Sequence, residues 1–325
     1  MIKLDSNQIR TLWLDEPYSG FLNNTAIAMG NFDGIHLGHR KIIQSLLDNA
    51  SSRNLTPVLL TFDPHPRIVF GQDFYILSTV YERELLLREF HLQMIVHIRF
   101  SKKLANIGYE EFVKNYLVNS LGMKLVVVGY DHHFGKQREG SPETLHKLGE
   151  KLGFETVVVA PVKVDGTEVK SNTIRELIQQ GKIDEANKFL GHHYLVAEKV
   201  IAGRGLGSQI GYPTANLDIS ANKLIPPDGV YSASTAIHPQ GEYKSSMVYI
   251  GRAPTFNLPT RMFETHIFDH DGSKLYGKYL SVKLIKFIRN DMTFRTVEEL
   301  KAQIDQDACR VKQTLMNREY HIPIK

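Results

Sequence analysis

Short runs of consecutive apolar residues alternate with longer amphipathic stretches in the first half of the chain. A run in which every position is apolar is typical of a strand that is buried on both faces of a sheet. The expected strands are Ala26–Met29, Val58–Phe62, Met94–Ile98, Leu125–Val128 and Thr156–Ala160. We therefore expect an α/β fold that begins with a doubly wound parallel sheet.

Helices between these strands are expected from their first residues. One covers residues 37–51, a second follows Ser78 and a third begins at Ser141. At the third start the serine caps backbone N–H groups, Pro142 fits the first turn and Glu143 complements the helix dipole. Ligands of such open sheets bind at the carboxyl ends of the strands, so the loops that follow the strands are the expected sites.

The pattern changes after Leu190 to short alternating segments broken by glycine and proline, which is typical of an antiparallel β-barrel or sandwich. The expected strands are His193–Val200, Gly229–Ala236, Ser246–Ile250, Met262–Phe268 and Leu280–Ile288. A last helix begins at Thr296, where Glu299 completes a capping box, and runs toward Leu315.

With 325 residues and 42% hydrophobic content, the chain is long enough for two packed domains. We place the boundary near Gly181–Gly191, which gives domains of residues 1–186 and 187–325. The single cysteine, Cys309, excludes an internal disulfide and a cysteine-rich metal site and fits a reducing compartment. No apolar run approaches the roughly 18 residues that cross a bilayer, so we expect a cytoplasmic protein without membrane contact.

The charge of the chain suits small anionic ligands. The net charge is +4 and the pI is about 8.9, but 39 basic residues against 35 acidic ones are nearly balanced. We therefore expect no nucleic-acid partner. The sequence leaves self-association open.

The segment Gly30–His39, GNFDGIHLGH, joins the first expected strand to the first helix. Gly30 and Gly34 permit positive φ angles and a close approach to a ligand, and a helix N-terminus attracts anions. His36 and His39 are three residues apart, so they point the same way and can stabilise charge on a leaving pyrophosphate. The alternative is that they only cap the helix and contact water. The flanking glycines and Asn-Phe-Asp favour the phosphate site, which is not of the Walker type.

Two further loops follow expected strands. Residues 61–66, TFDPHP, form a rigid polar turn that is either a wall for a planar ligand or a turn and nothing more. Residues 128–135, VGYDHHFG, combine Asp131 with aromatic side chains between glycines. We do not favour a metal site at His132 and His133, because adjacent histidines point apart and no acidic partner has suitable spacing.

Three further segments contain charged, glycine or polar residues that can bind phosphates or a metal ion. Arg175 lies in a capped helix start, SNTIREL, where a fixed guanidinium can hold a triphosphate or, alternatively, belongs to a solvated face. No helix pattern follows GRGLG at residues 203–207, so this is not a dinucleotide loop, although its amides and Arg204 can wrap phosphates. Thr214 and Asn216 face one side of an extended segment and can hold Mg²⁺ with phosphates and water, unless this is only a turn.

Glu264 is the candidate base. Strand alternation places Met262, Glu264, His266 and Phe268 on one face. A carboxylate between apolar neighbours is partly desolvated and can accept a proton from an attacking hydroxyl. The alternative is a glutamate that faces solvent at a sheet edge.

Together these motifs resemble a known family. GNFDGIHLGH, with TFDPHP, VGYDHHFG and SNTIREL in this order, resembles the His-x-Gly-His nucleotidyltransferases, specifically the prokaryotic bifunctional riboflavin kinase/FAD synthetases. The second half resembles riboflavin kinase in GRGLGSQIGYPTANL, PPDGVY, IGRAPTF, FETHIFD and LYGK. The similarity extends from about Asn24 to Asp305 and implies a nucleotidyltransferase domain followed by a flavokinase β-barrel with a terminal helix.

The resemblance carries site roles onto residues of this chain. The catalytic residues are Glu264, His36, His39 and Arg175. The ATP-binding residues are Gly30, Asn31, Phe32, Asp33, Gly34, Gly38, Ser171, Gly203, Arg204, Gly205, Gly207 and Gly211. The flavin-binding residues are Asp63, Pro64, His65, Pro66, Asp131 and Phe134, and the Mg²⁺ ligands are Thr214 and Asn216.

The activity that the resemblance implies has two steps. ATP and Mg²⁺ convert riboflavin to FMN, and the FMN phosphate then attacks the α-phosphorus of ATP to give FAD and pyrophosphate. The chain departs from the family pattern at Lys170, Asn172, His132, His133 and Tyr249. Two alternatives stay open: a flavokinase whose first domain is weak or adenylylates another phosphate ester, and a flavin- or RNA-binding regulator without catalysis.

Overall fold

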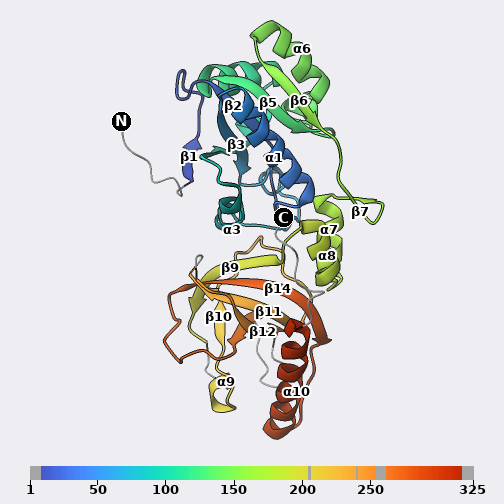
Figure 1. Cartoon of the computed structure of the whole chain (residues 1–325). Coiled ribbons are helices and arrows are strands. Elements are labelled where there is room, and N and C mark those ends of the chain that lie inside the picture. Colours follow the sequence, from blue (N-terminus) through green and yellow to red (C-terminus); the bar gives the residue numbers. More distant parts are fainter. Residues whose placement is uncertain (1–8, 204–205, 239–240, 253–260, 317–325) are drawn as a thin grey trace. The chain divides into compact units, whose positions relative to one another are not determined.

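The computed structural model describes residues 9–203, 206–238, 241–252 and 261–316 (Figure 1). The chain forms two compact units. The first comprises the residues up to Phe74 together with Arg83–Val169, and the second comprises Tyr75–Glu82 together with the residues from Lys170 onward. The domain limits expected at residues 186 and 187 stay a prediction.

Among the described residues, the first unit contains a six-stranded sheet with the order β1-β4-β3-β2-β5-β6, in which neighbouring strands are parallel. Its strands are β1 (Arg10–Leu14), β2 (Thr25–Met29), β3 (Thr56–Asp63), β4 (Met94–Arg99), β5 (Met123–Gly129) and β6 (Glu155–Val159). The doubly wound α/β fold and the five expected strands are confirmed. The sequence pattern missed β1, because only Leu14 of this strand is buried and no apolar run marks it.

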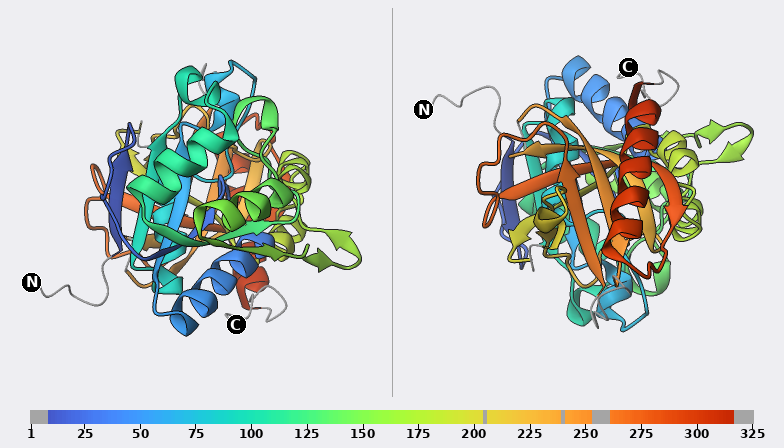
Figure 2. Two further views of the ribbon diagram at one scale, coloured as in Figure 1. Left: turned by 90° about the horizontal axis from the view of Figure 1, so that it is seen from above. Right: turned by 90° about the horizontal axis from the view of Figure 1, so that it is seen from below.

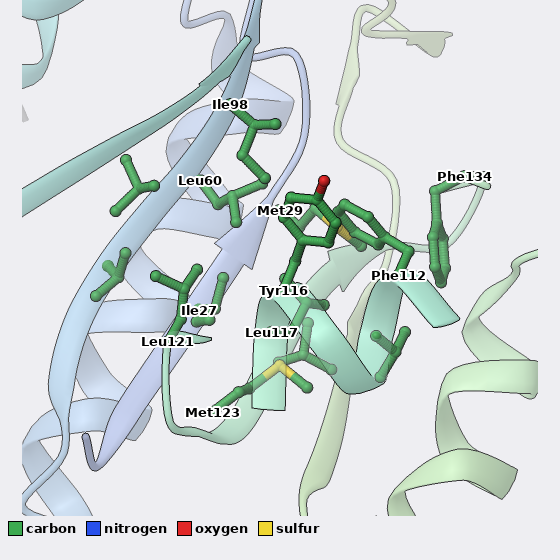
Figure 3. Packing of buried hydrophobic residues seen from close by; sticks show 14 of the residues in the cluster. Ile27, Met29, Leu60, Ile98, Phe112, Tyr116, Leu117, Leu121, Met123 and Phe134 are labelled. Carbon is green, nitrogen blue, oxygen red and sulfur yellow. The ribbon is translucent and has the colours of Figure 1, made fainter. Parts of the chain in front are cut away.

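Every residue of β2 is buried, since helices cover both faces of the sheet. Ala26 and Ala28 face the cluster that contains α1 (Leu37–Ser52), whereas Ile27 and Met29 face the opposite cluster. This second cluster receives side chains from η2 (Val113–Ser120) and α6 (Pro142–Leu152), as Figure 3 shows for Tyr116 and Leu117. The other elements are α2 (Pro66–Val69), α3 (Val80–Leu87), η1 (Arg88–Phe90), α4 (Lys102–Ala105), α5 (Tyr109–Phe112), η3 (Lys136–Arg138), β7 (Lys163–Val164) and β8 (Thr167–Glu168).

Two of the expected helix starts show how local sequence fixes the boundaries. Ser141 caps α6 in a capping box with Thr144, and Pro142 occupies the first turn, as expected. The start of α3 differs from expectation. Thr79 Oγ1 accepts from the N–H of Glu82 at 3.2 Å and the Glu82 carboxylate accepts from the N–H of Thr79 at 2.8 Å, so the reciprocal cap lies on Thr79, one residue after Ser78.

Within the described part of the second unit, six antiparallel strands close into a barrel with the order β10-β13-β12-β11-β14-β9. They are β9 (Tyr194–Ile201), β10 (Ala215–Leu217), β11 (Gly229–Ile237), β12 (Lys244–Gly251), β13 (Met262–Ile267) and β14 (Tyr279–Asn290). The five expected strands and the barrel implied by the resemblance are confirmed, and the sandwich alternative is excluded. β10 is three residues long, too short to give an alternating pattern.

The helices of this unit are α7 (Ser171–Gln179), α8 (Ile183–Leu190), α9 (Leu206–Gln209) and α10 (Val297–Met316). α10 packs on the outside of the barrel through Ala308 and Val311 (Figure 2, right). Thr296 Oγ1 accepts from the N–H of Glu299 at 3.1 Å, which confirms the expected start. The Glu299 carboxylate accepts from the N–H of Arg295, one residue before the cap, so the second half of the capping box is displaced by one position.

A buried ion pair between Lys223 and Glu82 stabilises the second unit. Both side chains are 0% exposed. The Lys223 ammonium donates to the carbonyl oxygens of Leu77 and Leu195, at 2.6 and 2.7 Å, and to Glu82 Oε2 at 2.7 Å. An ammonium group has three N–H donors, and all of them are used here.

Glu82 is satisfied on its other sides by the backbone. Its Oε1 accepts from the N–H of Ala197 at 2.8 Å, in addition to the bond from Thr79. A buried ion pair is stable only when further hydrogen bonds satisfy both charges, and this one meets that condition. It fixes residues 75–82, which precede most of the first unit in sequence, within the second unit.

We expect Lys223→Met to lower the free energy of unfolding by about 3–5 kcal/mol, because it leaves the Glu82 carboxylate buried without its cation. Lys199→Met is the matched control, since Lys199 is an exposed lysine of β9 and its loss removes the same charge. The control should change stability by less than about 0.5 kcal/mol. Urea unfolding of both variants tests this, and equal stability of the two would contradict it.

Candidate active sites

The loop after β2 turns tightly into α1, as expected, but the role of one glycine differs from the prediction. Gly34 has φ +83°, and Phe32 and Ile35 also have positive φ values of 49° and 43°. Gly30 does not have a positive φ, contrary to expectation. A Cβ on Gly30 would lie 3.3 Å from the Phe32 ring, so glycine is needed there for packing space rather than for backbone conformation.

His36 ends this loop and caps α1. Its Nδ1 accepts from the backbone N–H of His39 at 3.3 Å, so a neutral ring carries its proton on Nε2. The two imidazoles stack with centroids 3.6 Å apart, which confirms that they point the same way. The capping alternative is correct in part, but His36 is buried, not immersed in water. Stacking at this distance disfavours a positive charge on both rings at once.

Gly38 makes the histidine pair possible. A Cβ at this position would lie 3.1 Å from Cε1 and 3.2 Å from Nδ1 of His36. Such contacts are tighter than ordinary van der Waals distances, so any larger residue must displace the ring. A Cβ at Gly38 would therefore require the His36 ring to shift by a few tenths of an ångström.

The remaining candidate loops of this unit follow β3 and β5, on either side of β2. The strand order reverses between β2 and β5, which is where open α/β sheets bind ligands. Asp63 ends β3 with its side chain one-third exposed, and His65 stacks on Phe74 with centroids 4.4 Å apart. Asp131 follows β5 and is exposed. Phe32 and Asp33 are buried, so any nucleotide contact there would go through the backbone.

In the second unit, Thr214, Asn216 and Glu264 come together as expected. Thr214 Oγ1 donates to Glu264 Oε2 at 3.1 Å, and Asn216 lies directly opposite Glu264 across the β10–β13 pair. Burial raises the pKa of Glu264, while hydrogen bonds from Thr214 and Asn216 act in the opposite direction. The alternative of a fully solvated edge glutamate is wrong, because the carboxylate is hydrogen-bonded and β13 lies between two strands.

The face of β13 that carries Glu264 is the outer face of the barrel. Phe263, Thr265 and Ile267 are buried, and the residues between them are only partly buried. His266 follows on the outer face, where its Nδ1 bonds the carbonyl oxygen of Pro213 at 2.8 Å. Burial lowers the pKa of His266, so this ring is a neutral donor that holds the residue before Thr214.

The glycine-rich loop before β10 is described in part, and Arg204 and Gly205 lie outside the described residues. A Cβ on Gly203 would lie 2.2 Å from Asn216 Nδ2, and one on Gly207 would lie 2.2 Å from the carbonyl oxygen of Tyr212. Gly211 has φ +88°. One turn of helix, α9, begins at Leu206 within this segment, contrary to expectation, but four residues are too few for a dinucleotide-binding helix.

Comparisons with known proteins assign both units. A family model for FAD synthetase matches residues 19–173, and one for riboflavin kinase matches residues 190–315. The bifunctional riboflavin kinase/FMN adenylyltransferase of Buchnera aphidicola subsp. Acyrthosiphon pisum (strain APS) is 31% identical over 90% of this chain and 93% of its own. That of Escherichia coli (strain K12) is 32% identical over 88% and 91%. The chain belongs to the bifunctional riboflavin kinase/FMN adenylyltransferase family.

A solved structure is similar over the same extent. A crystal structure described as a macrolide-efflux protein from Streptococcus pneumoniae is 29% identical, with a TM-score of 0.82, and covers 94% of this chain and 99% of that one. The likeness shows a shared fold, and the description belongs to that protein. Among the residues that our structure describes, no helix has the length and hydrophobicity to span a membrane.

His132 lies in the loop after β5, at one of the positions where we expect a departure from the family pattern. Burial lowers the pKa of this histidine to about 4, so it is neutral at pH 7. Its ring stacks beside Phe134, with centroids 5.7 Å apart, where it resembles an aromatic residue in packing. No group of three or more His, Cys, Asp or Glu residues suited to a metal occurs in the described parts of the chain.

Arg175 and Ser171 are placed in the second unit. Arg175 Nε donates to the carbonyl oxygen of Tyr75 and its Nη1 to Asn172 Oδ1, both at 3.0 Å, so the guanidinium is fixed as expected. The expected side-chain cap is wrong, because the N-cap of α7 is Lys170 and its side chain makes no capping bond. The roles of Ser171 and Arg175 in ATP binding stay predictions.

Sequence reasoning missed Arg83. This side chain of α3 is 3% exposed and bonds both to the loop after β2 and to Asp63 at the end of β3. A single arginine within a helical pattern gives no local signal. Only the positions of three separate segments, which sequence does not provide, bring it to the site.

We expect Gly38→Ala to reduce FMN adenylylation roughly tenfold to a hundredfold, because it displaces the ring of His36, which the sequence predicts at the reacting phosphates. Pyrophosphate release with FMN and ATP measures this. Gly108→Ala is the matched control, since Gly108 has φ −63° and a Cβ there meets nothing within 4 Å. Unchanged adenylylation in Gly38→Ala would show that the His36 position is not needed.

Proposed function

We propose that the second unit phosphorylates riboflavin to FMN and that the first unit adenylylates FMN to FAD. The observation that supports this best is that each unit has its own set of groups for a triphosphate. The first has the stacked histidines at the start of α1, and the second has the Thr214–Asn216–Glu264 group. The family models fall on the two units in the same order.

For the kinase step, Glu264 accepts the proton of the ribityl hydroxyl that attacks the γ-phosphorus of ATP. Its burial favours this role, because a desolvated carboxylate is a stronger base than an exposed one. The hydroxyl of Thr214, the amide of Asn216 and the carboxylate are oxygen-bearing groups of the kind that suits Mg²⁺ together with phosphates and water. Thr214 and Asn216 would hold this ion, which shields phosphate charge.

For the adenylylation step, the FMN phosphate attacks the α-phosphorus of ATP and pyrophosphate leaves. The backbone of residues 30–34 and the N-terminus of α1 attract the phosphates, and the Nε2–H side of His36 is suited to donate to them. Asp63, Pro64, His65, Pro66, Asp131 and Phe134 flank the flavin. Positioning and charge stabilisation carry this reaction, so no protein nucleophile is needed.

We expect Glu264→Gln to lower FMN formation from riboflavin by about 10²–10⁴-fold, because the base is lost while the shape is kept. FAD formation from supplied FMN should not change. His36→Ala should do the reverse and lower FAD formation by about 10²–10³-fold. Chromatography of riboflavin, FMN and FAD over time, with ATP and Mg²⁺, gives both rates for each variant.

Loss of both activities in one folded variant would contradict the assignment to two sites. Parallel reactions with phosphopantetheine or nicotinamide mononucleotide in place of FMN test the alternative substrates of the first unit. Faster pyrophosphate release with either compound than with FMN would contradict FMN as the substrate. Salt-sensitive RNA binding without turnover would support the regulator instead.

The pH profile gives an independent test of Glu264. Burial raises its pKa above the ordinary 4.5, and the base acts only when ionised. Riboflavin phosphorylation should therefore fall about tenfold per pH unit as the pH drops through a value above 4.5. FMN adenylylation in the same preparation is the internal control and should not share this limb. Constant kinase kcat/KM down to pH 4.5 would contradict the role of Glu264.

A further inference from the structure

Arg83 connects two of the loops assigned above to the adenylylation site. Its Nη1 donates to the carbonyl oxygen of Asn31 at 3.3 Å, in the loop that leads to His36. Its Nη2 donates to Asp63 Oδ1 at 3.5 Å, in the loop assigned to the flavin. We propose that Arg83 is a positioning residue for FMN adenylylation, which fixes the spacing between the phosphate loop and the flavin loop. This inference rests on the proposed function of the first unit.

The carbonyl group of Asn31 is held from two directions. Thr61 Oγ1, on β3, also donates to this oxygen at 3.0 Å. A carbonyl oxygen has two lone pairs, and the two donors occupy both of them. Arg83 and Thr61 are 3% and 1% exposed, so both bonds are made away from bulk water, where they constrain the backbone most strongly. The first residue after Gly30 is thus tied to the neighbouring strand and to α3.

The other end of the guanidinium compensates the negative charge of Asp63. Asp63 keeps one-third of its side chain exposed and ends β3, directly before the loop assigned to the flavin. The buried, permanently charged guanidinium 3.5 Å away offsets this charge and holds the carboxylate in place.

Arginine is suited to this position by its shape. Its planar fork presents two N–H donors to two acceptors on different loops at once, whereas the ammonium of lysine is a single compact centre. Lysine at this position therefore keeps the charge but bonds one loop at a time. This difference separates positioning from a general need for a buried cation.

The test compares Arg83→Met, Arg83→Lys and Arg88→Met in the full chain. Arg88 is exposed, so its loss removes the same charge from the adjoining segment without touching the loops. We expect Arg83→Met to lower kcat of FMN adenylylation about a hundredfold and to change the KM of ATP less than threefold, because aligned geometry is lost while the phosphate contacts of α1 remain. Arg83→Lys should recover part of the rate, and Arg88→Met should equal the parent.

Riboflavin phosphorylation, measured in the same samples, distinguishes positioning from folding. If Arg83 is a positioning residue of the first unit, its variants keep riboflavin phosphorylation within twofold of the parent. Equal losses of both activities, together with a lower melting temperature in Arg83→Met and Arg83→Lys, would overturn the proposal in favour of a structural role. Adenylylation kcat within threefold of the parent in folded Arg83→Met would also overturn it. If the parent itself forms no FAD from FMN, the proposed function of the unit fails, and this result does not depend on any Arg83 variant.

Discussion

The buried ion pair between Glu82 and Lys223 connects residues 75–82 to the barrel unit. It is 0% exposed on both sides, and it is stable because backbone carbonyls and N–H groups satisfy the two charges. Together with the backbone hydrogen bonds of Ile76 to Asn222 and Leu224, it joins residues 75–82 to the barrel unit, although the chain returns to the first unit at Arg83. Position in sequence therefore does not decide which unit a residue stabilises.

Both candidate sites share one packing feature, a glycine placed directly against a polar side chain. Gly38 leaves room for the ring of His36, and Gly203 leaves room for the amide of Asn216. A side chain that fills the space left by a missing Cβ has few alternative rotamers. Each glycine thus reduces the conformational freedom of a neighbouring polar group before any substrate binds, and that entropy is then not lost during the reaction.

The sequence predicted the architecture and the local motifs well, because both leave signals within a few residues. Apolar runs marked the central strands, and the histidine spacing placed two rings side by side. The sequence did not predict features that depend on contacts between residues far apart in the chain. β1 has no apolar run and forms because it pairs with β4. Arg83 donates to the carbonyl oxygen of Asn31, which is 52 positions away in the sequence, so no local pattern indicates this contact. The capped start expected for α7 depends on where the helix begins, which short motifs define poorly.

The position of Glu264 outside the barrel follows from the size of the barrel. The hydroxyl of Thr235 bonds Ser246 at 2.7 Å and Thr265 at 3.3 Å across the interior, so side chains fill the inside. A closed barrel of few strands is too narrow to admit a ligand as well. Reactive groups must then lie on the outer face, where an exposed carboxylate would have an ordinary pKa. The segment that carries Thr214 lies against Glu264 and donates a hydrogen bond to it, and burial raises the pKa of this carboxylate although it lies on the outer face of the barrel.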